Sequence, residues 1–463
     1  MSITKKLTFL ATICVTIPTA LYYANDSQPS ANSTKSAADG IQEKCQNLSP
    51  EQRETINFIA WRPHHTLEHD SHVISVVITD SIIVTGSYDG TIKIWDRNNY
   101  QEIATLSHSN DYPVTSIAIV DNIIVTKSWT TKIWDKNNYQ EITLKRHDFI
   151  QSIAVADDII VTESYDKYDN TAKVWNRNNY QELATLKGHD DYVQSVAIAD
   201  DIIITGSRDG TTKIWDRNNY QELATLGKKL APLERYHGGP KSVTIADDII
   251  ATESGDYIVK IWDRNNYQEL ATLEGSLLTI TDDIIVTESS CDKTAKVWDR
   301  NNYQELAILK GHNQRINSVA VGDDIIVTGS YDKNAKVWDR NNYQELATLK
   351  MPYDYTDSVG VSVAIADSII VTGSTYGAAR VWNSKPFAGT VESNPLLWIL
   401  SHATTQQWDF IKRVCEAKKS LPYHYFLYEI QEGTSQERDN KTYLSFPEVV
   451  RQYLDDRLNI LEK

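Results

Sequence analysis

Residues 187–226 read KGHDDYVQSVAIADDIIITGSRDGTTKIWDRNNYQELATL, and this stretch is the cleanest copy of a unit that recurs along the chain. Within it, Tyr192–Ile198 alternates polar and apolar residues, as a strand with two different faces does. Ile202–Thr205 is a β-branched run that suits a strand buried on both sides. Asp209-Gly210 predicts a hairpin turn, because both residues tolerate positive φ. The runs TTKIW and YQELATL then complete a unit of four antiparallel strands.

The unit ends in Trp-Asp or Trp-Asn eight times, at intervals of 36 to 47 residues. The tryptophans are Trp95, Trp134, Trp175, Trp215, Trp262, Trp298, Trp338 and Trp382. A period near forty residues, with Gly-His at the start and Trp-Asp at the end, resembles the WD40 repeat, in which each copy is one propeller blade. The resemblance covers Trp61–Asn383 and implies an all-β fold, an eight-bladed WD40-like β-propeller with four-stranded antiparallel blades.

A strand before the first full copy is expected to complete the last blade. Trp61–His69 (WRPHHTLEH) matches Tyr100–His108 (YQEIATLSH), since both begin with an aromatic residue and end in T-L-x-H. The eighth copy lacks a good fourth strand after Trp382, because Pro386–Val391 is a poor strand. We therefore expect Trp61–Leu67 to pair beside the strand that ends at Trp382, which would close the ring and remove an exposed edge.

The N-terminal segments differ from the repeats. Residues 1–24 combine Lys5-Lys6 with an apolar run, as a secretory signal peptide or an uncleaved signal anchor does. They predict an exported protein, secreted or periplasmic, or one tethered by this segment, while a cytoplasmic location stays open. Residues 25–49 are a polar, flexible linker. Residues 50–60 should form a short helix, with Ser49 as N-cap and Gln52 three residues later, before the propeller of residues 61–384.

Residues 385–463 are expected to be mostly helical. Asn394-Pro395 can cap a helix with an apolar side, and Ser445-Phe446-Pro447-Glu448 is a capping box for a final helix through about Leu461. Residues 444–458 (LSFPEVVRQYLDDRL) resemble the opening helix of an F-box, and only that first helix fits. A propeller joined to an F-box is the plan of a ubiquitin-ligase substrate receptor, so the resemblance implies such a receptor, or a host-directed effector, as an alternative function.

Charge and cysteine content limit the partners. The 46 basic and 62 acidic residues give a net charge of −16. Nucleic acids and anionic membrane surfaces attract cationic proteins, so neither is expected as a partner, and a membrane would be reached only through the N-terminal segment. The four cysteines have no C-x-x-C spacing, so disulfides are optional and a structural zinc site is not expected.

The WD40 resemblance also implies a hydrogen-bonded set inside each blade. It comprises a His before the first strand, a Ser or Thr in the second, an Asp in the following turn, and the Trp. In the copy quoted above these are His189, Thr205, Asp209 and Trp215. Besides the tryptophans already named, the equivalent residues are His69, His108, His312, Asp89, Asp169, Asp256, Asp292 and Asp332. Such a set holds a blade together and contributes no catalysis.

No residue pattern predicts a metal, a cofactor or a reaction. His64, His65, His69 and His72 are close in sequence, but His69 belongs to the polar set of its blade and the others alternate along a strand. The repeated Asp pairs are solvated turns. The chain has no GxSxG, HExxH, P-loop or GxGxxG motif. Glu163, Glu253 and Glu288 replace the Gly of the T-G-S triplet, which we interpret as a tolerated substitution at a strand end. We expect no enzyme, and a propeller hydrolase is the weaker alternative.

One face of the ring varies between copies. The turns between strands one and two and between three and four are nearly uniform, while those between two and three, and between blades, differ and carry many Tyr, Trp and Arg residues. Variation on a repeated scaffold is typical of a binding face, and neutral drift is the alternative. We expect a monomeric scaffold that binds another protein or peptide through Tyr88, Trp129, Tyr168, Arg208, Lys229, Arg235, Tyr236, Tyr257, Tyr331 and Tyr376.

Overall fold

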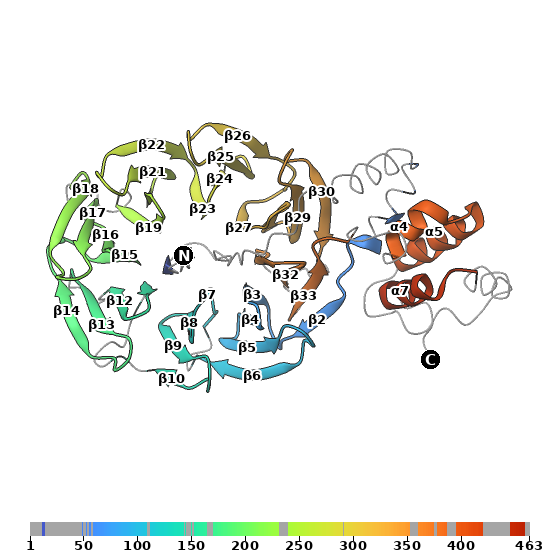
Figure 1. The fold of residues 1–463 in the computed structure, drawn as a ribbon, viewed down its shortest axis with the longest axis horizontal. Coiled ribbons are helices and arrows are strands. Elements are labelled where there is room, and N and C mark those ends of the chain that lie inside the picture. Colours follow the sequence, from blue (N-terminus) through green and yellow to red (C-terminus); the bar gives the residue numbers. More distant parts are fainter. Residues whose placement is uncertain are drawn as a thin grey trace, which may run out of the picture. The chain divides into compact units, whose positions relative to one another are not determined.

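The computed structural model describes residues 12–13, 49, 52, 55–56, 59–108, 112–142, 144, 150, 152–163, 170–230, 239–289, 291–351, 360–374, 377–386, 395–419 and 445–458. Eight antiparallel sheets stand in a ring, and each is one blade of a propeller (Figure 1). The predicted fold class is therefore confirmed. Within a blade the strands follow one another from the centre of the ring outward, so each second strand lies between two others.

The strands of the first four blades have the following bounds. Blade 1 contains β3 (Val73–Ile78), β4 (Ile82–Ser87), β5 (Thr91–Asp96) and β6 (Glu102–Ser107). Blade 2 contains β7 (Ser116–Val120), β8 (Ile123–Lys127), β9 (Thr131–Asp135) and β10 (Glu141–Ile142). Blade 3 contains β11 (Ile153–Val155), β12 (Ile159–Glu163), β13 (Ala172–Asn176) and β14 (Glu182–Leu186), and β1 (Thr12–Ile13) pairs with β11. Blade 4 contains β15 (Val193–Ile198), β16 (Ile202–Ser207), β17 (Thr211–Asp216) and β18 (Glu222–Gly227).

The remaining blades repeat this plan. Blade 5 contains β19 (Pro240–Ala246), β20 (Ile249–Ser254), β21 (Ile258–Asp263) and β22 (Glu269–Glu274). Blade 6 contains β23 (Ser276–Ile280), β24 (Ile284–Ser289), β25 (Thr294–Asp299) and β26 (Glu305–Leu309). Blade 7 contains β27 (Ile316–Val321), β28 (Ile325–Ser330), β29 (Asn334–Asp339) and β30 (Glu345–Lys350). Blade 8 contains β31 (Val363–Ala366), β32 (Ile369–Ser374), β33 (Ala378–Asn383) and β2 (His65–Glu68).

The last blade takes its outermost strand from the start of the propeller. Its order is β2-β33-β32-β31, as the match between residues 61–69 and 100–108 predicts. The strand begins at His65, four residues later than expected, although the backbone N–H of His64 already donates to the Val381 carbonyl (2.9 Å). Pro63 lies before the strand, so its missing N–H costs no ladder bond.

The core of the propeller lies between neighbouring blades. Every residue of β4, β16 and β28 is buried, as the β-branched runs predict. One hydrophobic cluster joins Val174 of blade 3 to Ile203 and Trp215 of blade 4, and clusters of the same kind fill other junctions. Since each sheet buries both faces against its neighbours, a blade removed from the ring would lose much of its core.

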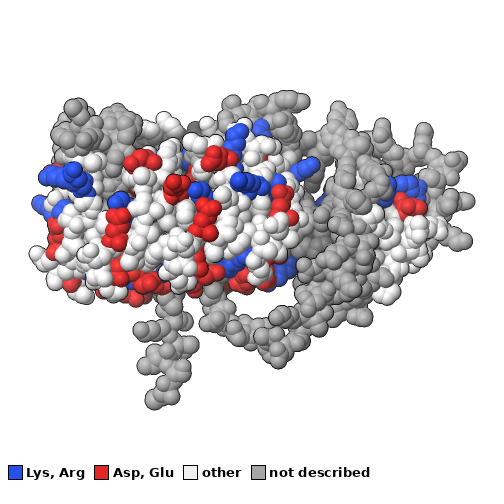
Figure 2. All heavy atoms as spheres, turned by 90° about the horizontal axis from the view of Figure 1, so that it is seen from above, with Lys and Arg blue, Asp and Glu red and all other residues white. Residues whose placement is uncertain are grey.

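The outer wall of the ring carries paired charges. Lys213 of β17 donates to Glu222 of β18 (2.8 Å), and equivalent Lys–Glu pairs recur in other blades. Figure 2 shows basic and acidic side chains alternating on this wall, with acidic residues gathered along one edge. Exposed pairs of this type each contribute about 0–1 kcal/mol to the free energy of unfolding. Their main effect is therefore to keep the outer wall polar.

The described residues form two compact units, and the second includes those between positions 24 and 66 and between positions 380 and 463. It contains α4 (Pro395–His402), α5 (Thr405–Lys419) and α7 (Glu448–Leu458). These helices share a core with the short N-terminal helix through Ile56, Ile59, Phe410, Val450 and Leu454, among others.

Two reciprocal caps start helices in this unit. The Ser49 and Gln52 side chains each accept the other's backbone N–H (3.2 and 3.0 Å), as the sequence predicts. Thr404 and Gln407 form the same box before α5. No helix in the described part of the chain is long and apolar enough to cross a bilayer. Apart from β1, the predicted signal segment lies outside the described residues.

Candidate functional site

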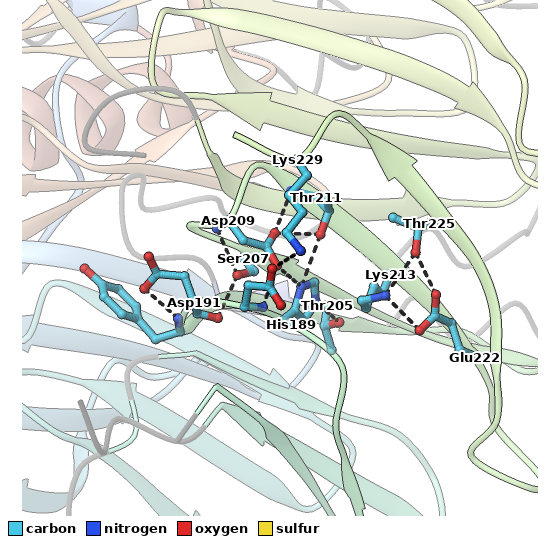
Figure 3. Close-up of polar contacts among 12 residues, drawn as sticks. His189, Asp191, Thr205, Ser207, Asp209, Thr211, Lys213, Glu222, Thr225 and Lys229 are labelled. Atoms are coloured by element: carbon cyan, nitrogen blue, oxygen red, sulfur yellow. Dashed lines mark hydrogen bonds and ion pairs between the residues drawn. The ribbon is translucent and has the colours of Figure 1, made fainter. Parts of the chain in front are cut away.

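The polar set inside blade 4 joins four side chains from different strands and turns, and Figure 3 labels three of them, His189, Thr205 and Asp209. Trp215 Nε1 donates to Thr205 Oγ1 (2.9 Å), and His189 Nε2 lies 2.8 Å from the same oxygen. His189 Nδ1 is 3.1 Å from Asp209 Oδ2, which also accepts the backbone N–H of Asp190 (2.9 Å). All four side chains are buried, so the set ties the start of the blade to its second and third strands.

Other blades hold complete or partial versions of this set. In blade 7, His312 lies 2.8 Å from both Thr328 and Asp332, and Trp338 donates to the same threonine. In blades 1 and 2, His69 and His108 contact threonines that also accept a Trp N–H. Trp175, Trp262 and Trp298 likewise donate to a second-strand threonine (2.9–3.0 Å), and Trp382 is buried.

The electrostatic surroundings of the histidine differ between blades 1 and 2 and blades 4 and 7, where an Asp is hydrogen-bonded to it. Burial, together with Lys93, lowers the pKa of His69 to about 4, and burial with Lys132 does the same for His108. Burial opposes ionisation of Asp332, but hydrogen bonds from His312 and from backbone N–H groups outweigh it and lower the pKa to about 2. The same balance holds the pKa of Asp209 far below its usual range.

Two members of the expected set lie elsewhere. Asp256 and Asp292 are exposed, and Asp292 accepts a hydrogen bond from the Ser289 hydroxyl (3.1 Å). The physical reason in blade 6 is that Ser276 stands near the usual His position, so no imidazole draws the carboxylate inward. Asp89 joins Thr91 through its side chain (2.6 Å), and Asp169 lies outside the described residues.

The face with uniform turns holds the blades to one another. Arg300 of blade 6 donates to Thr281 O of its own blade, and to Ala246 O (2.9 Å) and Asp248 Oδ1 (2.7 Å) of blade 5. Its side chain is only 7% exposed, so these bonds are shielded from water. Arginines at the same turn position clamp other junctions in the same way: Arg97, Arg177, Arg217, Arg264 and Arg340.

Tyrosines in the same turns fill the junctions. Tyr220 adopts φ 63°, and its ring packs against the hydrophobic cluster shared by blades 3 and 4. A positive φ in a bulky residue is strained, so a tertiary contact must hold it. Tyrosines at the equivalent position share this backbone conformation: Tyr100, Tyr139, Tyr180, Tyr267, Tyr303 and Tyr343. The turns of the uniform face therefore share one sequence because each of them holds a junction between two blades.

The opposite face, which we call the rim, is formed by the turns between second and third strands and by the connections between blades. In the described part of these turns, the exposed large aromatic side chains are Tyr88, Trp129, Tyr257 and Tyr331. Each second strand ends opposite the start of the first strand of its blade. In blade 1, the Tyr88 N–H donates to His72 O at this point (2.7 Å). The varied turns therefore stand beside the connections that precede each blade.

A neighbour from the preceding connection orders several of these side chains. Trp129 stacks on Tyr112 with ring centroids 5.3 Å apart, and Tyr88 meets His72 edge-on at 6.0 Å. Arg208 lies over the Tyr192 ring (5.2 Å) and donates to its hydroxyl (2.6 Å). His72, Tyr112 and Tyr192 are not among the rim residues predicted from the sequence, because that prediction rests on the turns and not on the strand start across from each turn.

Not every expected rim residue is described. Lys229 is exposed and forms an ion pair with Asp190. Tyr168, Arg235, Tyr236 and Tyr376 lie outside the described residues. In the described part of the chain, no group of three or more His, Cys, Asp or Glu side chains is arranged to hold a metal ion.

Comparison with known proteins agrees with this geometry. The family model "WD domain, G-beta repeat" matches residues 54–96, 180–216 and 303–339. Three segments of the chain are WD40 repeats, and its eight sheets form a propeller. The chain is similar to the crystal structure of the computationally designed Ika8 protein, with 29% identity and a TM-score of 0.55 over 68% of this chain and 97% of that one. No curated protein matches this WD40 chain.

Proposed function

We propose that the protein is a non-catalytic scaffold that binds another protein through the rim of its WD40 propeller. The observation that carries this proposal is the contrast between the two faces. On the uniform face, the Arg and Tyr side chains of the turns are used in joints between blades. On the rim, the aromatic side chains of Tyr88, Trp129, Tyr257 and Tyr331 are exposed to solvent.

The rim has the chemistry of a protein-binding surface. Tyr, Trp and Arg supply most of the binding energy in protein interfaces, and an ordered side chain loses less entropy on binding. Trp129 is 57% exposed while Tyr112 stacks on it, so a large apolar surface is already fixed in place. Such a surface can bind a partner that lacks the symmetry of the ring, because each blade presents a different set of residues at the rim.

The test is a set of alanine substitutions at exposed rim positions. Affinity purification of the full chain followed by mass spectrometry identifies a partner, and binding is then measured with the purified pair. Tyr88→Ala, Arg208→Ala and Tyr331→Ala together should abolish binding and leave the melting temperature unchanged, since truncating one interface hot spot costs about 2 kcal/mol or more.

The matched control lies on the uniform face. Asn98, Asn218 and Asn341 are exposed and hydrogen-bond through their backbone N–H groups, so alanine there should change neither folding nor binding. The turn arginines would be a poor control, because they clamp the blades. Retained binding in the rim variant would contradict the proposal.

The ubiquitin-ligase receptor is the alternative, and the helical unit tests it. Deleting residues 444–463 would remove Phe446, Val450 and Leu454 from the helical core, so loss of binding would be uninformative. Val449 of α7 is 48% exposed, and Val449→Asp changes the surface alone. If this variant loses a second bound protein while the rim variant keeps it, the receptor function is favoured.

A further inference from the structure

One sheet of the ring has a fifth strand. In the described part of the chain, the other seven blades begin at the centre with their own first strand, whereas the order in blade 3 is β1-β11-β12-β13-β14. The added strand, β1, lies inside the ring (Figure 1). It pairs antiparallel with β11, with Thr12 opposite Ala154 and Ile13 opposite Ile153. The inner edge of β11, meaning the side that faces the centre of the ring, is therefore occupied.

The ladder of blade 3 shows which backbone groups point inward. The Glu163 N–H donates to Ser152 O (3.2 Å), so Ser152 faces β12. Because the direction of the backbone groups alternates along an antiparallel strand, Ile153 turns its N–H and C=O toward the centre of the ring. Ile13 lies directly opposite, so the backbone of β1 meets groups that an uncovered strand edge would leave unpaired.

Burial of the first strands differs around the ring in a way that agrees with this pairing. Val155 of β11 and Ile198 of β15 each lie opposite the second isoleucine of the next strand, and each is 1% exposed. At the same register, Ile78 of blade 1 is 8% exposed and Val321 of blade 7 is 6% exposed. The equivalent residues of blades 2, 5 and 6 are half-buried. Since β1 lies close to both β11 and β15, its position accounts for the deeper burial in blades 3 and 4.

The N-terminal segment has the composition of a strand. Residues 7–17 read LTFLATICVTI, and six of these eleven residues are β-branched, which favours an extended backbone. The run carries no charge and ends before Pro18. An uncharged strand suits the inner edge of β11, because Ile153, Ala154 and Val155 are all apolar and buried. The residue types on both sides therefore agree with the pairing.

We propose that the inner edge of β11 is an acceptor site for an extended apolar segment, and that the chain's own N-terminal segment occupies it by strand addition. The site is separate from the rim, so it goes beyond the scaffold function. In strand addition, main-chain hydrogen bonds supply the affinity and side chains supply the specificity. Thr12 and Ile13 cannot pair with β11 and enter a membrane at the same time. Docking therefore keeps the segment from acting as a leader or an anchor.

Hydrogen exchange of backbone N–H groups tests the site. The full-length protein is made in the cytoplasm of a host cell, and its intact mass confirms that the N-terminal segment is present. Exchange is then followed by mass spectrometry, with fragmentation that resolves single N–H groups. Ile13→Pro removes the N–H that faces β11, so the Ile153 N–H should exchange about tenfold faster or more. Ile13→Val keeps the N–H and should leave exchange at Ile153 unchanged.

Blade 7 supplies an internal control. Val319 of β27 stands at the register of Ile153, and no described strand covers that inner edge. Its N–H should exchange at the same rate in all three proteins. The melting temperature should stay the same too, because each blade keeps its own four strands. Equal exchange at Ile153 in the full-length protein and in the Ile13→Pro variant would overturn the inference.

A peptide distinguishes strand addition from other causes of slow exchange. A synthetic peptide of residues 5–17, added in excess to the Ile13→Pro protein, should slow exchange at Ile153 again. The same peptide carrying Ile13→Pro should not. If both peptides slow exchange equally, or if neither does, the inner edge is not a strand acceptor and the inference fails. Slow exchange that depends on the concentration of the full-length protein would show that the segment comes from a second copy, and would overturn occupancy within one chain.

Discussion

His69 and His108 each place an imidazole against a threonine hydroxyl, at 2.6 and 2.9 Å, in blades where no described carboxylate is hydrogen-bonded to the ring. A neutral imidazole needs no counter-charge, whereas a protonated one in this position would be a buried cation. His189 and His312 instead have Asp209 and Asp332 within hydrogen-bond distance. The same residue type therefore occupies two electrostatic environments within one chain.

This difference makes stability depend on pH. The pKa values of His69 and His108 are lowered in the folded state from 6.5 to about 4, so the unfolded chain takes up their protons first as pH falls. The free energy of unfolding should drop between these values by up to about 1.4 kcal/mol per pH unit for each histidine. The contribution of Asp332 is present above pH 3.8 and is lost only as pH falls toward about 2.

Denaturant unfolding at a series of pH values between 7 and 4 checks this prediction. A variant with His69→Gln and His108→Gln should be less stable at pH 7, and its stability should fall less steeply with acid. Parallel slopes for the two proteins would show that these histidines do not govern the acid sensitivity.

At the level of elements, the turn between the third and fourth strands acts as a joint. Its Arg bonds to the preceding blade while its Tyr covers the junction. The sequence predicted the turn correctly, since Asp-Arg-Asn-Asn is turn chemistry. It did not reveal the joint, because Arg217 and its partner Asp158 are 59 residues apart and no local pattern connects them.

Removal of one joint should destabilise the propeller measurably. Arg300→Ala deletes bonds to Ala246 O and Asp248 across the junction of blades 5 and 6 and leaves a buried carbonyl without this donor. We expect the free energy of unfolding to fall by about 2 kcal/mol or more. Asn301→Ala in the same exposed turn is the control and should change stability little. Equal stability of both variants in denaturant unfolding would contradict the role of the clamp.

For the whole molecule, the repeats alone predicted the ring and the number of its blades. Eight Trp positions and eight β-branched runs define the strands, and apart from β1 and β2 each described strand pairs with strands that are consecutive to it in sequence. The burial of Glu253 and Glu288, which are 4% and 0% exposed, could not be predicted. The sequence shows only that each replaces a repeated glycine, and it does not show what the next blade places against that position.

Closure of the ring by β2 can be tested against an ordinary blade. Leu67 of β2 is fully buried and matches Leu226 of β18, which is 4% exposed. If β2 is an integral fourth strand, Leu67→Ala and Leu226→Ala should each cost about 2–5 kcal/mol through loss of contacts and a cavity. Thermal unfolding of both variants measures this. A much smaller loss for Leu67→Ala would mean that the strand is only loosely attached.

The position of β2 in the sequence also determines when the last blade can form during translation. The strand leaves the ribosome before any complete blade, yet its partner β33 begins at Ala378. At a synthesis rate of 5–20 residues per second, the strand waits roughly 15 to 60 seconds for that partner. During this interval seven blades can assemble while the eighth cannot, so a chaperone that shields an open sheet edge would find its substrate only while translation lasts.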